Sequence, residues 1–228
     1  MTLRRRTVIK MGLGVGATPL LARLPRVAQE PDQGSGTLKA ALLQARPLPL
    51  NAVRLLGGPL KRAQDLDARY LLRLEPDRML AYYRERAGLR PRAEPYNGWD
   101  GGGRNLTGHV AGHYLSAVSL MWAATGDERF KERADYIVRE LKEVQEGHGD
   151  GYLSALEGGR EAFGALARGE IRSSAFDLNG EWSPWYTLHK TYAGLRDAYR
   201  HTGNCTALEV EIKFAEWAER ILSGLDEG

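Results

Sequence analysis

Residues 106–127 read LTGHVAGHYLSAVSLMWAATGD, and this stretch decides the fold class. Its apolar residues recur at helical spacing, and it ends in a Thr-Gly-Asp turn at 125–127 that a second helical segment follows. Residues 188–222 repeat this order, with a Thr-Gly-Asn turn at 202–204 between two helical segments. Two copies of one αα-hairpin predict an all-α fold, built as a toroid or solenoid of helical hairpins.

The first hairpin carries two histidines, His109 and His113, at a spacing that puts them on one helix face. Gly112 lies between them, and a glycine inside a helix costs about 1 kcal/mol, so it indicates that a ligand or another helix approaches the backbone closely. The pair could bind a metal, pack structurally or bind ligand hydroxyls. Because HVAGH lacks the glutamate of a zinc-protease helix and neutral imidazole offers one donor and one acceptor, we favour hydroxyl binding.

The second hairpin begins with aromatic residues in EWSPWYTLHKTYAGL, residues 181–195. Together with Trp182, the side chains of Trp185, Tyr186 and His189 lie near its predicted start, which Ser183 caps before Pro184. An aromatic ring can stack on the C–H face of a sugar while histidine or tyrosine bonds its hydroxyls, although core packing also explains such tryptophans. We predict that these three side chains bind substrate.

Equivalent helices of a hairpin toroid point the same way, so the starts of the two histidine-bearing helices should lie at one end. Thr107 is the predicted N-cap of the first helix, which places His109 and His113 in its first two turns. His189 falls in the second turn of the other helix. The three histidines are therefore expected to converge.

The net charge of +3 comes from the beginning of the chain. Residues 1–28 contain six basic residues and no acid, and without these six the chain has 26 basic against 29 acidic residues. The remainder is mildly acidic, which argues against nucleic acid as a partner.

The basic beginning has the features of an export signal. Arg5-Arg6 precede an apolar segment, residues 11–21, that is too short for a stable membrane span. This pattern resembles the twin-arginine signal, which the export machinery reads and removes, and a disordered basic tail is the alternative. Residues 1–36 are expected to be signal peptide and linker, and the protein is expected in the periplasm or secreted.

Four stretches together resemble a known family. YLLRLEPDRMLAYYRERAGL, GHVAGHYLSA, DGYLSA and WSPWYTLHKTYAGLRDAY are similar, in this order, to the N-terminal half of the β-L-arabinofuranosidase-like glycoside hydrolases of families 127 and 146. The resemblance implies an (α/α)6 barrel that releases L-arabinofuranose from plant glycans or glycoproteins. In it, His189 matches a histidine of the sugar pocket, and His109 and His113 match the family 146 form of the motif.

The same resemblance implies a retaining mechanism with a cysteine nucleophile on a zinc ion and a glutamate acid/base, all from the C-terminal half of the family. None of these groups is matched here, since Cys205 is the only cysteine and follows the 202–204 turn. We therefore expect residues 37–228 to be a truncated front part of the barrel, an incomplete toroid with no catalytic or metal-binding residue. Zinc is expected only in a full-length protein, and this chain alone should be inactive.

Two other functions remain open. The chain could be a non-catalytic module that binds carbohydrate or another partner. It could also belong to a helical-barrel glycosidase that uses paired carboxylates, for which the loops offer candidates. These are Asp100, Asp150, Asp177 and Glu181.

Overall fold

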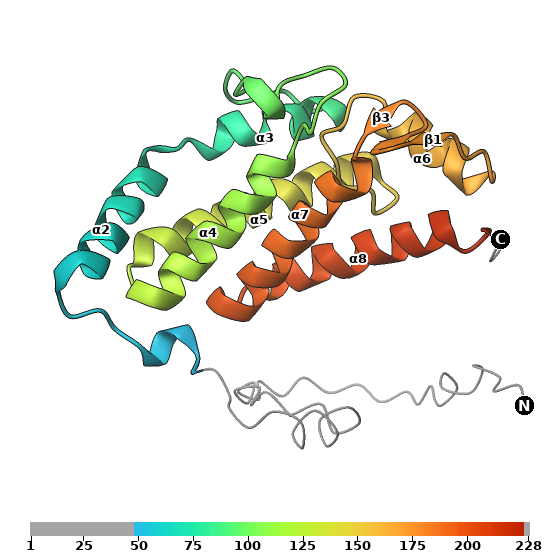
Figure 1. Ribbon diagram of the computed structural model, residues 1–228. Helices are drawn as coiled ribbons and strands as arrows, with labels where there is room; N and C mark the ends of the chain where they lie inside the picture. Colours follow the sequence, from blue (N-terminus) through green and yellow to red (C-terminus); the bar gives the residue numbers. More distant parts are fainter. Residues whose placement is uncertain (1–47, 226–228) are drawn as a thin grey trace, which may run out of the picture. The chain divides into compact units, whose positions relative to one another are not determined.

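The computed structural model describes residues 48–225, and these are mostly helical (Figure 1). The predicted signal peptide and linker, residues 1–36, lie outside the described residues. The all-α prediction is confirmed, whereas closure into a toroid stays a prediction. The α-helices are α2 (Gly58–Arg73), α3 (Pro76–Arg86), α4 (His109–Thr125), α5 (Glu128–His148), α6 (Gly159–Ala167), α7 (Pro184–Asp197) and α8 (Cys205–Leu222).

Shorter elements join these helices. Two 3₁₀ turns, η1 and η2, occupy Leu50–Ala52 and Gly98–Asp100, and a π-helical turn, η3 (Ala198–Thr202), continues α7. A small antiparallel meander, which periodicity did not predict, precedes α7. It consists of β1 (Ser173–Ser174), β2 (Asp177–Leu178) and β3 (Glu181–Trp182), paired in that order.

The two predicted hairpins are confirmed as α4–α5 and α7–η3–α8, and their turns share the same chemistry. Gly126 and Gly203 both take the left-handed conformation, with φ of 73° and 74°. The next residue in each turn, Asp127 or Asn204, accepts a backbone hydrogen bond as the N-cap of the following helix. Because a glycine C′ residue and an Asx N-cap satisfy the free backbone groups locally, each turn forms from its own sequence.

The hairpins pack through their first helices, so that α4 and α7 lie side by side, while α5 and α8 also contact each other (Figure 1). At the crossing the backbones nearly touch. A Cβ added to Gly112 would lie 2.2 Å from the carbonyl oxygen of Lys190, and one on Gly194 would lie 2.7 Å from that of Gly112. Of the two explanations for Gly112, the approach of another helix is therefore the one that the structure supports.

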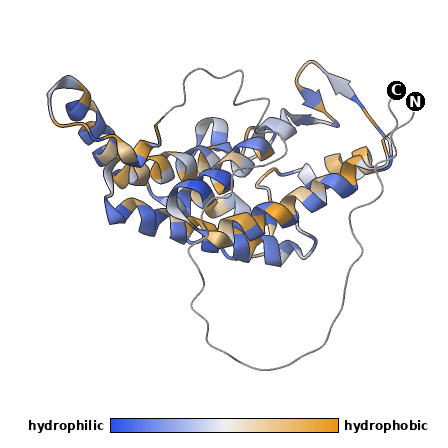
Figure 2. Ribbon diagram, turned by 90° about the horizontal axis from the view of Figure 1, so that it is seen from below, coloured by the Kyte–Doolittle hydropathy of each residue, from blue (hydrophilic) through white to orange (hydrophobic). Residues whose placement is uncertain are grey.

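The core fills the space between these helices. The outer helices α5 and α8 carry both hydrophobic and hydrophilic residues along their length, as amphipathic packing requires (Figure 2). Phe130, Leu115 and Leu195 are fully buried at the contacts between the hairpins. Charged side chains of α5 also enter the interior: Glu140 is buried and accepts a 2.7 Å hydrogen bond from Arg84 of α3. The outer helices therefore contribute buried ion pairs as well as solvated faces.

The helix starts differ from prediction in their caps. The α4 helix begins at His109 with Gly108 as N-cap, so the prediction that Thr107 caps it is wrong: the Thr107 hydroxyl instead donates to the carbonyl of Gly101. Ser183 is the N-cap of α7 ahead of Pro184, as predicted, but its side chain makes no cap bond. A left-handed backbone at Ser183, with φ 48°, explains this, because a capping side chain acts from an extended residue.

The α2 helix is the least covered of the long helices. Its side chains Leu60, Leu66 and Tyr70 are each more than half exposed. Across residues 48–225, none of the helices combines the length and the apolar character that a membrane crossing requires.

Candidate functional site

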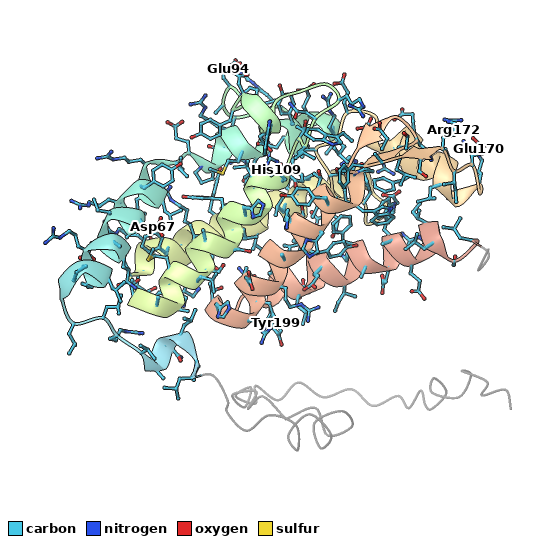
Figure 3. The ribbon with its side chains drawn as sticks, in the orientation of Figure 1. Asp67, Glu94, His109, Glu170, Arg172 and Tyr199 are labelled. Atoms are coloured by element: carbon cyan, nitrogen blue, oxygen red, sulfur yellow. The ribbon has the colours of Figure 1, made fainter. Side chains whose placement is uncertain are left out.

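Two histidine rings stand at the beginning of α4. His109 is buried, and His113, one turn later, is exposed. Their ring centroids are 5.8 Å apart and the rings are nearly perpendicular. Figure 3 shows His109 where α4 begins, close to the start of α7. The predicted common face of these two side chains is thus present.

Asp100 fixes the position of His109. One carboxylate oxygen of the buried Asp100 accepts hydrogen bonds from the backbone N–H of Gly108, at 2.8 Å, and of Val110, at 3.4 Å. The same oxygen lies 3.5 Å from Nδ1 of His109, which also makes a 2.7 Å hydrogen bond to the carbonyl of Leu106. A carbonyl oxygen only accepts, so Nδ1 carries the proton, and in the neutral ring Nε2 is an acceptor.

The α7 helix brings a tyrosine and a lysine to these histidines. The Tyr186 hydroxyl is 3.5 Å from Nε2 of His113, and its ring centroid is 6.2 Å from that of His109. Lys190, one turn further, holds its ammonium 4.5 Å from the centre of the Tyr186 ring. His189 is exposed beside them on the same helix. The expected convergence of the two helix starts is therefore observed.

The two α4 histidines have opposite pKa shifts. Burial lowers the pKa of His113, and the nearby charges of Lys190, His109 and His189 lower it further. For His109 burial also acts downward, but the Asp100 carboxylate and the Leu106 carbonyl outweigh it, so that its pKa is raised. At neutral pH His113 is therefore a neutral ring with one donor and one acceptor, suited to a hydroxyl group.

Trp185 does not join this group. Its ring packs edge-on against Phe163 of α6, with centroids 4.9 Å apart, and lies 6.5 Å from the ring of Trp217 on α8. This is the core packing that the sequence left open as an alternative. Contact between Trp185 and a sugar stays a prediction.

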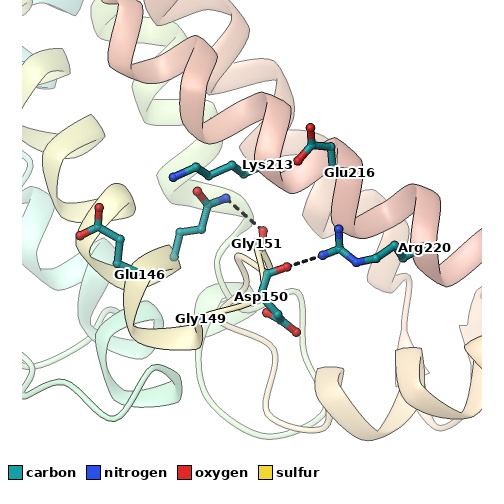
Figure 4. Close-up of a pocket in the computed structure, with 8 residues that line it drawn as sticks. Glu146, Gly149, Asp150, Gly151, Lys213, Glu216 and Arg220 are labelled. Atoms are coloured by element: carbon teal, nitrogen blue, oxygen red, sulfur yellow. Dashed lines mark hydrogen bonds between the residues drawn. The ribbon is translucent and has the colours of Figure 1, made fainter. Parts of the chain in front are cut away.

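The glycine-rich loop that follows α5 belongs to a different surface. Tyr152 is buried, and its ring centroid lies 4.8 Å from that of Trp217. Arg220 of α8 donates to the backbone carbonyl of Asp150 at the edge of a cavity of about 430 Å³ (Figure 4). The cavity is lined by Gln145, Glu146, Gly149, Asp150, Gly151, Lys213, Glu216 and Arg220. This loop therefore ties α5 to α8.

The other loop carboxylates have separate environments. Asp150 and Asp177 form ion pairs with Arg160 and Arg104 respectively. Glu181 is buried, its Oε2 atom has no hydrogen-bond partner within residues 48–225, and burial raises its pKa. The raised pKa of Glu181 suits a general acid.

The residues do not fit a zinc site of the kind that the resemblance implies. Such a site needs several cysteine thiolates, whereas Cys205 is exposed at the start of α8, beyond the opposite end of α7 from Tyr186. In the part of the chain that the structure describes, no three histidine, cysteine or acidic side chains come together as metal ligands.

Comparison with known families decides which family these residues represent. The family model described as "Beta-L-arabinofuranosidase, GH127 catalytic domain" matches residues 52–228. The chain belongs to this family. A comparison with curated proteins gives no match. Residues 52–228 thus belong to a glycoside hydrolase family of the β-L-arabinofuranosidase type.

Within this GH127 domain, the sequence did not place two residues, Lys190 and Asp100, in the histidine cluster. Lys190 follows His189 directly, but nothing in the sequence shows that it faces the Tyr186 ring. Asp100 was predicted only as one of several loop carboxylates, because it lies eight residues before the N-cap Gly108 and no spacing rule connects it to the start of α4.

Proposed function

We propose that the starts of α4 and α7 form part of the sugar-binding wall of a β-L-arabinofuranosidase-type glycoside hydrolase. The observation that carries this proposal is the cluster of His109, His113 and Tyr186, which joins two helices of a GH127 domain at their N-terminal ends. We also propose that the two hairpins belong to an (α/α)6 barrel.

The chemistry of the cluster suits a furanose with several hydroxyl groups. His113 is neutral, so it can accept a hydrogen bond from one hydroxyl or donate one to another. The Tyr186 hydroxyl adds a second group with both capacities. Lys190 adds donors beside them, and Trp185 and His189 remain proposed ligands of the same sugar. We assign these residues binding and orientation, and no bond-breaking step.

Binding of methyl β-L-arabinofuranoside to the 228-residue chain tests this function by isothermal titration calorimetry. The His113→Ala variant should bind about tenfold more weakly, because removing one partner of a ligand hydrogen bond costs about 1–2 kcal/mol. His201→Ala is the matched control, since His201 lies in η3 at the other end of α7. Equal affinities for the wild type and His113→Ala, or no binding by the wild type, would refute the proposal.

Export is a separate proposal that rests on residues 1–36 alone. Replacing Arg5 and Arg6 together by lysine should keep the protein in the cytoplasm of a host with twin-arginine machinery, because the receptor reads the arginine pair. Cell fractionation followed by immunoblotting measures this. Unchanged export of the double variant would contradict the twin-arginine assignment.

A further inference from the structure

A pair of tryptophans lies in the two segments that lead into the histidine cluster, Trp99 in η2 before α4 and Trp182 in β3 before α7. The rings of Trp99 and Trp182 are 6.5 Å apart between centroids and nearly perpendicular, at 82°. Trp99 is 69% exposed, and Trp182 is half-buried. Together Trp99 and Trp182 form an exposed apolar patch, here called the ledge. Exposed apolar patches of this kind mark interaction sites.

Both tryptophans are joined directly to the residues of the proposed sugar site. Trp99 precedes Asp100, the residue that contacts the ring of His109, and consecutive Cα atoms are about 3.8 Å apart. Trp182 ends β3 just before Ser183, whose left-handed backbone turns the chain into α7 and its Tyr186. Both tryptophans therefore lie in segments that lead directly into the cluster.

The backbone around the ledge is fixed before any ligand binds. The carbonyl of Trp99 accepts a 3.1 Å hydrogen bond from the N–H of Leu106, and the side-chain amide of Asn105 donates to the carbonyl of Gly98 at 2.8 Å. Trp182 pairs with Asp177 across the meander. A ligand that stacks on these rings has little backbone freedom to remove, which favours binding.

Polar groups border the same rings. Arg104, in the loop of Trp99, forms an ion pair with Asp177, the strand partner of Trp182, and both side chains are accessible. Aromatic faces beside a charged donor and acceptor match a sugar ring, whose C–H face is apolar and whose edge carries hydroxyl groups. If the ligand were an apolar protein surface, the ion pair between Arg104 and Asp177 would have no role in binding it.

We propose that Trp99 and Trp182, with Arg104 and Asp177, form a second subsite that binds the sugar unit next to the terminal arabinofuranose. This inference rests on the proposed function of the histidine cluster. It assigns selection of the glycan to the ledge: ligands longer than one unit gain affinity from the tryptophans, whereas a single arabinofuranoside does not.

Calorimetry of the 228-residue chain with two ligands tests the subsite: methyl β-L-arabinofuranoside, and an oligosaccharide of two or three units that ends in β-L-arabinofuranose. The wild type should bind the oligosaccharide up to about tenfold more tightly, the size of one aromatic contact. The Trp99→Ala variant should lose this gain and keep its affinity for the methyl glycoside. Trp99→Phe should recover part of the gain. Tyr70→Ala, which removes a similarly exposed ring on α2, should behave as wild type.

Any other outcome of the calorimetry overturns the second subsite, the histidine site or both. Equal affinity of the wild type for both ligands, or an unchanged gain in Trp99→Ala, overturns the subsite and leaves the histidine site standing. A Trp99→Ala variant that weakens both ligands equally places Trp99 in the first site, which also overturns the second subsite. If the wild type does not bind the methyl glycoside, the proposed function fails and the subsite fails with it.

Discussion

Substitution of Gly112 by alanine tests whether the close packing of α4 against α7 requires the absence of a side chain at this position. The added Cβ would lie 2.2 Å from the carbonyl oxygen and 2.3 Å from the carbonyl carbon of Lys190. Both are backbone atoms, so no side chain can rotate away. Ordinary contact begins at 3.4 Å, and the two helices must therefore separate by about 1.2 Å.

Two opposing effects set the size of the change. Alanine favours the helix by about 1 kcal/mol over glycine. Overpacking a close contact costs about 1–3 kcal/mol, and the clash with backbone puts Gly112→Ala at the upper end. The net loss is about 2 kcal/mol, which lowers the melting temperature by about 4–8 °C for a unit of this size.

The assay is thermal unfolding followed by circular dichroism, with Gly164→Ala as the control. Gly164 lies inside α6, and its added Cβ would meet only the end of the Arg168 side chain, at 3.6 Å. That variant should gain about 0.5–1 kcal/mol. If Gly112→Ala is stabilised as much as Gly164→Ala, the close backbone contact is not the reason for this glycine and the reasoning is wrong. A second consequence is functional, because separating the helices moves His113 away from Tyr186.

The remaining predictions concern charge. Burial, reinforced by the charge of Arg160, lowers the pKa of His148 from 6.5 to about 4. Between these pH values the unfolded chain binds a proton that the folded chain does not, so the free energy of unfolding falls as the pH falls. His148→Gln should therefore lose less melting temperature than the wild type between about pH 7 and pH 5; equal losses would show that His148 does not contribute. Glu140→Gln removes the buried negative charge that is paired with Arg84 and should cost about 3 kcal/mol in urea unfolding. Glu143→Gln, at a half-exposed carboxylate, should cost less than about 1 kcal/mol. Similar costs for both variants would contradict the role of burial.

Local chemistry made the hairpins predictable. Residues 125–127 and 202–204 contain all the groups that close their turns, namely a glycine for the left-handed position and an Asx side chain that caps the next helix. The groups that close each turn are local, so the sequence alone predicted them; the side-chain amide of Asn204 in addition donates to Asp135 of α5 at 2.7 Å. The family motifs likewise indicated the GH127 match, because they follow one another in a fixed order along the chain.

Which side chains enter the site depends on which faces of the helices pack against each other. Trp185 and Tyr186 are neighbours in the sequence, yet one ring packs against α6 and α8 while the other faces the α4 histidines. Aromatic residues at helical spacing are equally compatible with core and site, so their pattern could not separate these two roles.

The sequence by itself determined the helical hairpins, their turns and the family, because each depends on neighbouring residues or on motifs read in order. Only the tertiary structure decided that Gly112 admits a helix backbone, that Asp100 caps α4 beside His109, and that Trp99 meets Trp182. The reason is physical: these contacts join residues that are not chain neighbours, and their geometry is set by the packing of α4 against α7 and of the loops around it.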